Sequence, residues 1–340
     1  MTEFSAGYQT GTVLDPDRTN WDGTGPRPIS WSLWYPSETS SATEKQLIGP
    51  PGRPYFDNGL INSVGDVSKG KVAYPLILMS HGTGGSAPAM GWFGRRMAEA
   101  GYFVLGANHH GNTSLEPYRP EGFLCSWERS RDLSRLADDI LVNPAFADRI
   151  DRGRIFAAGH SLGGHTVLAC AGATYSNDQF LSWLGDQPDL DGPREFPDLG
   201  KHVGPLMANS QPFREAMSRH GKSYHDPRFK AVFAMAPAPT VRGFTDRSLV
   251  GVRTPVHIQT GAADQECPAD TCTHWLGSKN PDFQIEILEG DVGHYVYLSL
   301  ATEHAREDLP QISIDPPSVD RDTIHTHAAT AAHRFFSATV

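Results

Sequence analysis

The sequence predicts an α/β protein with a mostly parallel central sheet, helices on both faces and an insertion over one end of the sheet. From residue 74 onward, short apolar runs alternate with segments in which apolar residues recur at helical spacing. Repeated strand–helix–strand units give parallel strands whose crossover helices cover the sheet. Residues 174–225 interrupt this alternation with a stretch rich in Pro, Asp and Gly. We therefore expect a single domain over residues 1–340 that carries 174–225 as a cap.

The composition of the chain excludes several classes of protein. Its 340 residues are 39% hydrophobic and 20% charged, which suits a folded chain with a sizeable core. The net charge of −10 argues against a nucleic-acid partner, because such proteins need a basic face to displace counterions from phosphates. No stretch approaches the roughly 18 apolar residues of a membrane span, and residues 1–10 lack the pattern of a secretory signal. We expect a cytoplasmic protein, and its composition leaves the oligomeric state open.

The individual elements follow from the periodicity of apolar residues. In RPISWSLWYP (27–36), bulky side chains alternate with smaller ones from Ile29 to Tyr35, which predicts a strand. Residues 37–71 have no such pattern, and we expect a long connection there. Apolar runs predict further strands at YPLILMSHG (74–82), YFVLGANHHG (102–111), RIFAAGHS (154–161), FKAVFAMAPA (229–238), TPVHIQTGAAD (254–264) and FQIEILEGDVGH (283–294). Helices are predicted at residues 87–100, SWERSRDLSRLADDIL (126–141), SLGGHTVLACAGA (161–173) and THAATAAHRFF (326–336).

The motif GHSLG (159–163) is the first feature that carries chemistry. It matches G-x-S-x-G, follows an apolar strand and precedes an Ala-rich helix, which is the setting of a nucleophile elbow. A serine on such a tight turn needs small neighbours, and the helix that follows aims free N–H groups at the reacting oxygen. An N-cap serine in a glycine-rich turn is the structural alternative. The motif predicts Ser161 as a catalytic nucleophile.

The loop HGTGG (81–85) comes directly after the first strong strand. In an α/β-hydrolase this loop supplies one backbone donor of the oxyanion hole, and the residue after the nucleophile supplies the other. We therefore expect the N–H groups of Thr83 and Leu162 to bind the oxyanion. A phosphate-binding loop is the alternative, but the chain has neither G-x-G-x-x-G nor G-K-[ST] at this position.

An acid and a histidine complete the predicted constellation. Asp264 follows the strand VHIQTG (256–261), and His294 follows the last strand. The chain order Ser161, Asp264, His294 is that of an α/β-hydrolase triad. Asp246 is the alternative acid, after the strand that follows the nucleophile helix. We favour Asp264, because a short loop fixes a carboxylate more firmly than a long one.

Other histidines and two cysteines also need an interpretation. His109 and His110 lie at a strand end and His160 lies beside the nucleophile, so we expect these three to line the substrate pocket. A metal site at the histidine pair is the alternative, but it has no further ligand at suitable spacing, and we expect no metal and no cofactor. Cys267 and Cys272 are close enough for a disulfide, although thiols in a cytoplasmic chain are more often reduced.

The chain resembles the bacterial relatives of platelet-activating-factor acetylhydrolase, a group often labelled predicted dienelactone hydrolases. The resemblance rests on DPDR (15–18), WYP (34–36), SHG (80–82), WERSRD (127–132), GHSLGG (159–164), DPRFKA (226–231) and GH (293–294). It covers most of the chain and least of the insertion. It implies an α/β-hydrolase fold and a serine esterase for short to medium acyl chains that needs no metal. Dienelactone hydrolases proper use a cysteine nucleophile, and Ser161 departs from that pattern.

The predicted function is therefore hydrolysis of a small-molecule carboxylic ester through an acyl-enzyme. His294 would act as the general base toward Ser161, and Asp264 would orient the imidazole. The same groups also cleave amides, so an amidase or peptidase is the nearest alternative. A hydrolase fold used only for binding is a further alternative from another class of protein.

Overall fold

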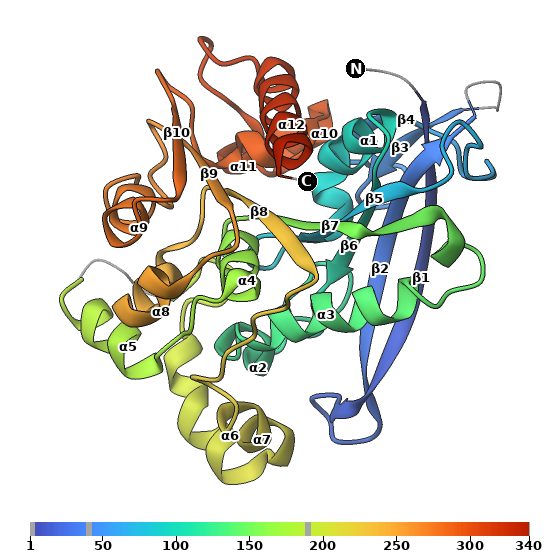
Figure 1. Ribbon diagram of the computed structural model, residues 1–340. Coiled ribbons are helices and arrows are strands. Elements are labelled where there is room, and N and C mark those ends of the chain that lie inside the picture. The colour runs from blue at the N-terminus through green and yellow to red at the C-terminus, as the bar shows by residue number, and fades with distance from the viewer. Residues whose placement is uncertain (1–3, 39–42, 188–191, 340) are drawn as a thin grey trace.

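In the computed structural model, which describes residues 4–38, 43–187 and 192–339, an eight-stranded sheet runs through the centre of the molecule (Figure 1). Its strand order is β1-β2-β6-β5-β7-β8-β9-β10. The pairs β1–β2 and β2–β6 are antiparallel, and the pairs from β6 to β10 are parallel. A second sheet has the order β11-β4-β3. The predicted mostly parallel sheet is thus confirmed.

The strands of the two sheets are β1 Ser5–Thr19, β2 Pro26–Ser37, β3 Glu44–Ile48, β4 Phe56–Ile61, β5 Tyr74–Ser80, β6 Phe103–Asn108, β7 Ile150–His160, β8 Phe229–Met235, β9 Val256–Gly261, β10 Gln284–Leu288 and β11 Leu300–Ala301. The α-helices are α1 Gly91–Glu99, α2 Pro120–Leu124, α3 Glu128–Ile140, α4 Leu162–Ala171, α5 Asn177–Gly185, α6 Val203–Asn209, α7 Gln211–Met217, α8 Asp246–Gly251, α9 Thr273–Lys279, α10 Glu303–Asp308, α11 Pro310–Ser313 and α12 Arg321–Ala338. Short 3-10 helices are η1 Ala87–Met90, η2 Ala147–Arg149, η3 Leu199–His202, η4 Pro239–Gly243 and η5 His294–Tyr297.

The N-terminal part of the chain differs from the prediction. Residues 37–71 were expected to be a long connection, but β3 and β4 lie within them and pair as antiparallel strands. The strand β1 was not predicted at all, because its sequence SAGYQTGTVLDPDRT has no apolar run. It pairs with β2 along most of its length and forms the edge of the main sheet, so backbone hydrogen bonds rather than apolar burial define it.

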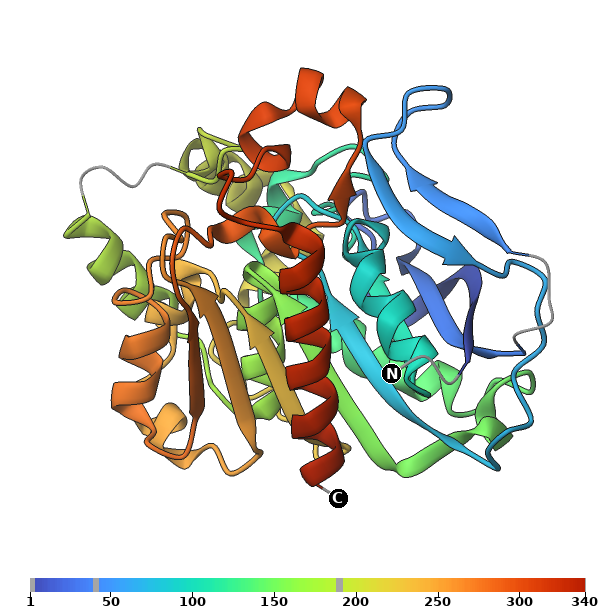
Figure 2. The same ribbon diagram turned by 90° about the horizontal axis from the view of Figure 1, so that it is seen from above.

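Helices cover both faces of the main sheet, as the strand–helix alternation predicts (Figure 2). One apolar core lies between the sheet and α3, α4, α8 and α9, and a second lies between the sheet and α1 and α12. The strands β5 and β6 are buried over their whole length and β7 from Ile155 to His160, since helices pack on both faces of the sheet there. This double burial fixes the register of the strands, and with it the positions of their carboxyl ends.

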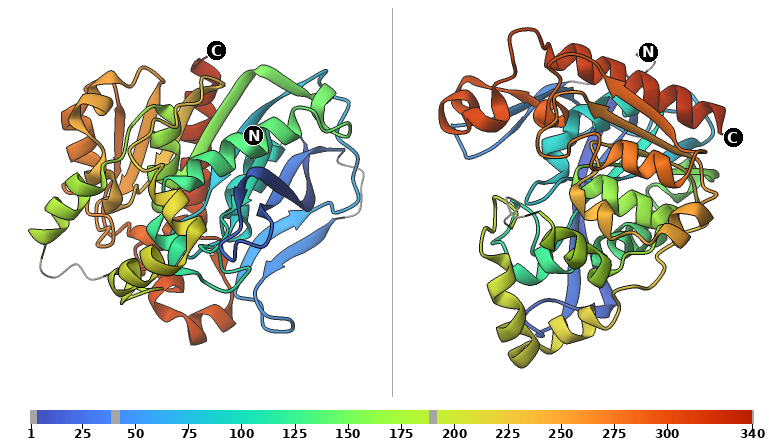
Figure 3. Two further views of the ribbon diagram at one scale, coloured as in Figure 1. Left: turned by 90° about the horizontal axis from the view of Figure 1, so that it is seen from below. Right: turned by 90° about the vertical axis from the view of Figure 1, so that its left-hand side faces the viewer.

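The part of the insertion from η3 to α7 lies beside α2 and the start of α3, whereas α5 packs against η4 (Figures 1 and 3). The described residues of the insertion form α5, η3, α6 and α7. The indole Nε1 of Trp127 donates to the carbonyl of Ala216 at 2.9 Å, and Phe213 is fully buried in the larger core. The helix α7 is therefore anchored to the body of the protein by both a hydrogen bond and apolar burial.

A buried cluster of charged groups joins the N-terminal strands to α3. The carboxylate of Asp132, which is 0% exposed, accepts hydrogen bonds from Arg18 at 2.6 Å and from Arg27 at 2.9 and 3.1 Å. Arg18 also pairs with Asp15 and Glu128, at 2.6 and 3.0 Å. Burial opposes ionisation of Asp132, but Arg27 and Arg18 hold the pKa of its carboxyl well below the usual range.

Removing the charge at the centre of this cluster should destabilise the fold. Asp132→Asn leaves Arg18 and Arg27 buried without full compensation, and we expect a loss of about 3–5 kcal/mol in the free energy of unfolding. The matched control is Lys45→Ala, which removes an exposed ion pair with Asp57 and should cost less than about 1 kcal/mol. Urea denaturation measures both values. Equal losses for the two variants would contradict the role given to the buried cluster.

Candidate active site

Ser161 lies between the end of β7 and the start of α4 in a strained backbone conformation. Its φ of 57° and ψ of −119° are values that non-glycine residues rarely adopt. Two backbone hydrogen bonds hold this turn, from the Ser161 N–H to Met235 at 2.9 Å and from the Ala238 N–H to Ser161 at 3.0 Å. A strained residue persists only where its surroundings determine it, and such residues cluster at functional sites.

The glycines of GHSLG allow the close packing that this turn requires. A Cβ on Gly163 would lie 1.9 Å from the carbonyl oxygen of Ser80, and a Cβ on Gly159 would lie 2.2 Å from that of Gly163. Both contacts are with backbone atoms that cannot move aside. The small residues of the motif are therefore a steric requirement of the strand–turn–helix unit.

His294 and Asp264 meet at the carboxyl ends of the neighbouring strands. The Nδ1 atom of His294 lies 2.8 Å from Oδ2 of Asp264, and the other carboxylate oxygen accepts the N–H of Cys267 at 2.7 Å. Both side chains are buried, and Ser161 and His294 are only 8% and 7% exposed. By contrast, Asp246 is exposed at the start of α8 and pairs with Lys279 at 2.8 Å.

The thiol of Cys267 lies near both the predicted nucleophile and the predicted base. Its Sγ atom is 4.0 Å from Nε2 of His294 and is close to the hydroxyl of Ser161. Burial raises the pKa of the Cys267 thiol well above its usual range, so the sulfur stays protonated at neutral pH. The potential ligand atoms of Asp264, Cys267 and His294 are close enough together to hold a metal ion. A neutral thiol and a carboxylate engaged through both oxygens make this donor set a poor fit to zinc.

The two predicted oxyanion donors are both backbone N–H groups without an acceptor in the described residues. Leu162 is the first residue of α4, so its N–H has no carbonyl partner within the helix. Among the residues that the structure describes, neither this N–H nor that of Thr83 donates to an acceptor. The loop that carries Thr83 is close to the nucleophile, since a Cβ on Gly82 would lie 3.2 Å from Cβ of Ser161. Two free backbone donors beside a serine match the arrangement of an oxyanion hole.

A comparison with protein families identifies the fold that carries this site. The model of the alpha/beta hydrolase family matches residues 77–307, which is more than half of the chain. This chain belongs to the alpha/beta hydrolase family. The predicted superfamily is thereby confirmed, and its order of serine, acid and histidine agrees with the geometry described above.

Solved structures with the same fold include two hydrolases. This alpha/beta hydrolase is similar to a ferulic acid esterase from Streptomyces cinnamoneus, with 17% identity and a TM-score of 0.64 over 100% of this chain and 91% of that chain. It is also similar to a putative dipeptidyl aminopeptidase IV from Bacteroides ovatus, with 14% identity and a TM-score of 0.50 over 99% of this chain and 36% of that chain. At such identities the likeness concerns the fold alone. None of the curated proteins matches the chain.

The three histidines predicted to bind substrate occupy different places in this alpha/beta hydrolase. His109 is fully buried, with Nδ1 2.9 Å from Asp132 and Nε2 2.9 Å from Ser80, so both ring nitrogens are engaged inside the protein. His110 is bound to Glu116 at 2.8 Å. The ring of His160 lies against that of His294 in a tilted arrangement, with a centroid distance of 4.6 Å and an interplanar angle of 38°. Of these three histidines, only His160 contacts a residue of the predicted triad, and it lies against the imidazole ring of His294.

Two residues that no sequence motif indicates, Asn112 and Tyr118, hold the loop that carries Thr83. The side-chain oxygen of Asn112 accepts the N–H of Gly84 at 2.7 Å, and the hydroxyl of Tyr118 donates to the carbonyl of Gly84 at 2.6 Å. Neither residue belongs to a motif of the sequence. Their position after β6, the strand beside β5, is the only signal that places them near this loop.

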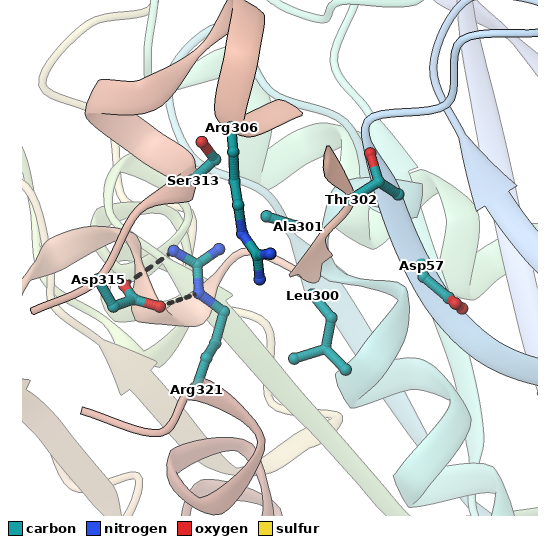
Figure 4. Close-up of a pocket in the computed structure, with 8 residues that line it drawn as sticks. All are labelled: Asp57, Leu300, Ala301, Thr302, Arg306, Ser313, Asp315 and Arg321. Carbon is teal, nitrogen blue, oxygen red and sulfur yellow. Dashed lines mark hydrogen bonds and ion pairs between the residues drawn. The ribbon is translucent and has the colours of Figure 1, made fainter. Parts of the chain in front are cut away.

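Neither the cysteine pair nor a pocket near the C-terminal helices adds to the site. All four cysteines are free, so the disulfide considered for Cys267 and Cys272 is not formed. A pocket of about 320 Å³ lies between the second sheet and the C-terminal helices, where Arg306 extends into it and Arg321 pairs with Asp315 (Figure 4). The residues that line this pocket do not include the predicted triad. In the described residues, no helix has the length and apolar character that crossing a membrane requires.

The geometry makes a direct prediction about the acid. Asp264→Asn keeps the shape of the side chain but favours the wrong tautomer of His294, so we expect kcat to fall by about 10⁴-fold. Asp246→Asn is the matched control and should leave kcat within about twofold, because Asp246 is exposed and paired with Lys279. Steady-state hydrolysis of an activated ester measures both. The reverse result would place the acid at Asp246.

Proposed function

We propose that this alpha/beta hydrolase is a serine hydrolase that cleaves small-molecule carboxylic esters of short to medium acyl chain through an acyl-enzyme. The observation that carries the proposal is the 2.8 Å contact between His294 and Asp264 beside the strained turn of Ser161. A buried carboxylate on Nδ1 leaves Nε2 as the nitrogen that can take a proton from the serine. This arrangement supports nucleophilic catalysis more than any binding role.

The reaction proceeds in two steps. His294 removes the hydroxyl proton as Ser161 attacks the ester carbonyl, and Asp264 stabilises the imidazolium that forms. The N–H groups of Thr83 and Leu162 bind the oxyanion, each contributing about 3–4 kcal/mol to transition-state stabilisation. His294 then protonates the leaving alcohol, the ester bond breaks, and an activated water releases the acid from the serine. No step requires a metal or a cofactor.

The residues around His294 suit this cycle. The Nε2 atom of His160 lies 3.2 Å from the carbonyl oxygen of His294, and the two rings are in tilted contact. Burial lowers the pKa of His160 well below its ordinary value, with a further effect from His294, so His160 stays neutral while His294 becomes charged. We assign His160 to the orientation of the base. The protonated thiol of Cys267 is a weak nucleophile, which leaves Ser161 as the attacking group.

The ester proposal has one alternative that the same residues could carry out. The resemblance of the sequence to the acetylhydrolase relatives favours esters, and the name of the Streptomyces structure denotes an esterase. The name of the Bacteroides structure denotes a peptidase, and amide cleavage uses the same triad with a leaving nitrogen that needs protonation. A panel of p-nitrophenyl esters of increasing chain length, with the matching anilides, distinguishes the two. We place the protein in the cytoplasm, as the sequence predicts.

Loss of the nucleophile is the primary test of the proposal. Ser161→Ala should abolish ester hydrolysis, with kcat lowered at least about 10⁴-fold, and should prevent labelling by a fluorophosphonate probe. The fold should remain intact, because the turn tolerates a small side chain, and circular dichroism with thermal unfolding serves as the control. Residual turnover within tenfold of the parent would refute the assignment of Ser161. An unlabelled parent protein that hydrolyses no ester or anilide would instead favour a binding function.

Segment 192–196 of the insertion lies over the site, which supports the proposed role of residues 174–225 as a cap. The guanidinium of Arg194 lies 5.3 Å from the ring centroid of Tyr295, the residue after His294. On the other side, Cγ of Glu195 lies 2.7 Å from the position that a Cβ on Gly84 would take. The segment therefore bridges the histidine loop and the oxyanion loop. We propose that it limits the size of the acyl group.

Shortening side chains of the cap should widen the range of substrates. We expect Arg194→Ala combined with Glu195→Ala to raise kcat/KM for long acyl esters relative to acetyl esters by about tenfold, since each extra methylene accommodated is worth about 1–3 kcal/mol. Met207→Ala, an exposed position on α6, is the matched control. Deleting the whole insertion (residues 174–225) is a poorer test, because its helix α7 contributes Phe213 to the core. An unchanged chain-length profile in the folded double variant would exclude this role.

A further inference from the structure

The motif WERSRD (127–132) has no part in the proposed reaction, yet it places a fully buried arginine beside the site. Arg129 lies near the start of α3 and is 1% exposed. In the described part of the chain it forms no ion pair within 4.0 Å, whereas Arg18 and Arg27 both bind carboxylates directly. Burying a guanidinium that has no carboxylate partner lowers the stability of the fold. The hydrogen bonds of Arg129 must therefore serve a purpose other than charge pairing.

All three nitrogens of Arg129 donate to the segments that frame the oxyanion hole. Nη2 donates to the carbonyl of His81 and, at 3.3 Å, to the hydroxyl of Ser80. Nη1 donates to the side-chain oxygen of Asn112 at 3.3 Å, and Nε donates to the hydroxyl of Thr166 at 3.2 Å. One planar group thus contacts the end of β5, the loop after β6 and the first turns of α4.

Each of these contacts leads to one of the two predicted oxyanion donors. The carbonyl of His81 lies in the loop that carries Thr83, and Asn112 holds the N–H of the next residue, Gly84, at 2.7 Å. On the other side, the hydroxyl of Thr166 donates to the carbonyl of Leu162 at 2.9 Å. Arg129 is therefore linked to the Thr83 segment and to the Leu162 segment through at most one intervening side chain.

The charge of Arg129 is supported through a relay rather than by direct contact. Its Nη2 donates to Ser80, whose hydroxyl lies 2.9 Å from Nε2 of His109, and Nδ1 of His109 lies 2.9 Å from Asp132. Burial lowers the pKa of His109 to about 3, so the ring is neutral and can donate from Nδ1 and accept at Nε2. The relay connects the oxyanion loop to the buried charge cluster of Asp132.

We propose that Arg129 is a positioning residue for the oxyanion hole, which joins the Thr83 loop to the N-terminus of α4 and sets the distance between the two backbone donors. This inference rests on the proposed function and adds to it a residue that no triad assignment requires. An oxyanion hole works only when its donors are preorganised at the place where charge develops. A guanidinium suits the task because its fork of five N–H groups is planar and rigid.

A lysine at this position could not replace the fork. Its single ammonium nitrogen can reach one or two of the four acceptors but cannot span His81 and Thr166 together. Arg129→Lys therefore keeps the positive charge and loosens the two donors relative to each other. The expected consequence is a loss in transition-state binding, with little change in the binding of ground-state substrate.

The decisive experiment compares Arg129→Lys with Arg27→Lys in the full-length protein. Both arginines are fully buried and belong to the same polar cluster, but Arg27 donates to Asp132 and not to the oxyanion segments. Both variants should lower the thermal stability. Only Arg129→Lys should lower kcat, by about 10²-fold, with KM changed less than threefold. The same variant should weaken the binding of a boronic acid inhibitor, which forms a tetrahedral adduct, by a similar factor.

A milder variant keeps the test valid if Arg129→Lys does not fold. Thr166→Val removes only the hydroxyl that links Arg129 to Leu162, and should lower kcat by roughly tenfold with KM unchanged, since one of the two donors loses part of its support. If Arg129→Lys does fold, the double variant should lose less than the product of the two single effects, because both disrupt the same link.

Three outcomes separate this proposal from its alternatives. Unchanged kcat in Arg129→Lys, or in Thr166→Val where the first variant does not fold, would overturn the positioning role. An equal loss of kcat in Arg129→Lys and Arg27→Lys would also overturn it, because it would point to stability alone. A parent protein without Ser161-dependent turnover would refute the proposed function itself. Turnover of the parent and of Ser161→Ala is therefore measured before that of any arginine variant.

Discussion

The strained turn at Ser161 is the constraint on which the rest of the site depends. A positive φ at a non-glycine residue persists only where neighbouring groups hold it, and here hydrogen bonds to Met235 and from Ala238 do so from the β8 side. The backbone of β5 leaves no room for a side chain on Gly163, and the backbone of Gly163 leaves none on Gly159. These contacts require β5, β7 and β8 to be adjacent and parallel, and the helices on both faces keep them so. The packing of these three strands thus positions Ser161, the proposed nucleophile.

The buried charge cluster has a comparable role on the other side of the site. Strands β1 and β2 extend the parallel sheet with an antiparallel hairpin, and Arg18 and Arg27 of that hairpin meet Asp132 on α3. Buried ion pairs contribute little net stability compared with apolar groups, but they fix geometry because each partner must be satisfied. Through His109 and Ser80 the cluster reaches the loop that carries the oxyanion donor. The N-terminal hairpin therefore helps to hold α3 in place, and Arg27 donates to Asp132 rather than to the segments of Thr83 and Leu162.

The features that the sequence predicted well share one physical property, which is that they are local. The apolar runs of β5 to β9 are buried on both faces, and GHSLG needs its glycines for contacts within a single strand–turn–helix unit. The preference for Asp264 over Asp246 rested on loop length alone, and the geometry supports it, since Asp246 is exposed on α8. The edge strand β1 and the hairpin of β3 and β4 were missed because backbone pairing defines them, and their sequences lack apolar runs.

The sequence by itself therefore determined the fold class and the alpha/beta hydrolase family, and it predicted the order of serine, acid and histidine, because periodicity and motif spacing follow from local geometry. Only the tertiary structure decided what surrounds these residues. It placed His109 in a buried relay rather than on a pocket wall, left Cys267 as a free thiol beside His294, and brought Arg129 against both oxyanion segments. Ser80, Asn112, Arg129 and Thr166 are scattered along the chain, and no local pattern relates them. They meet because parallel strands deliver their carboxyl ends to one edge, and hydrogen bonds at that edge depend on side chains from different elements.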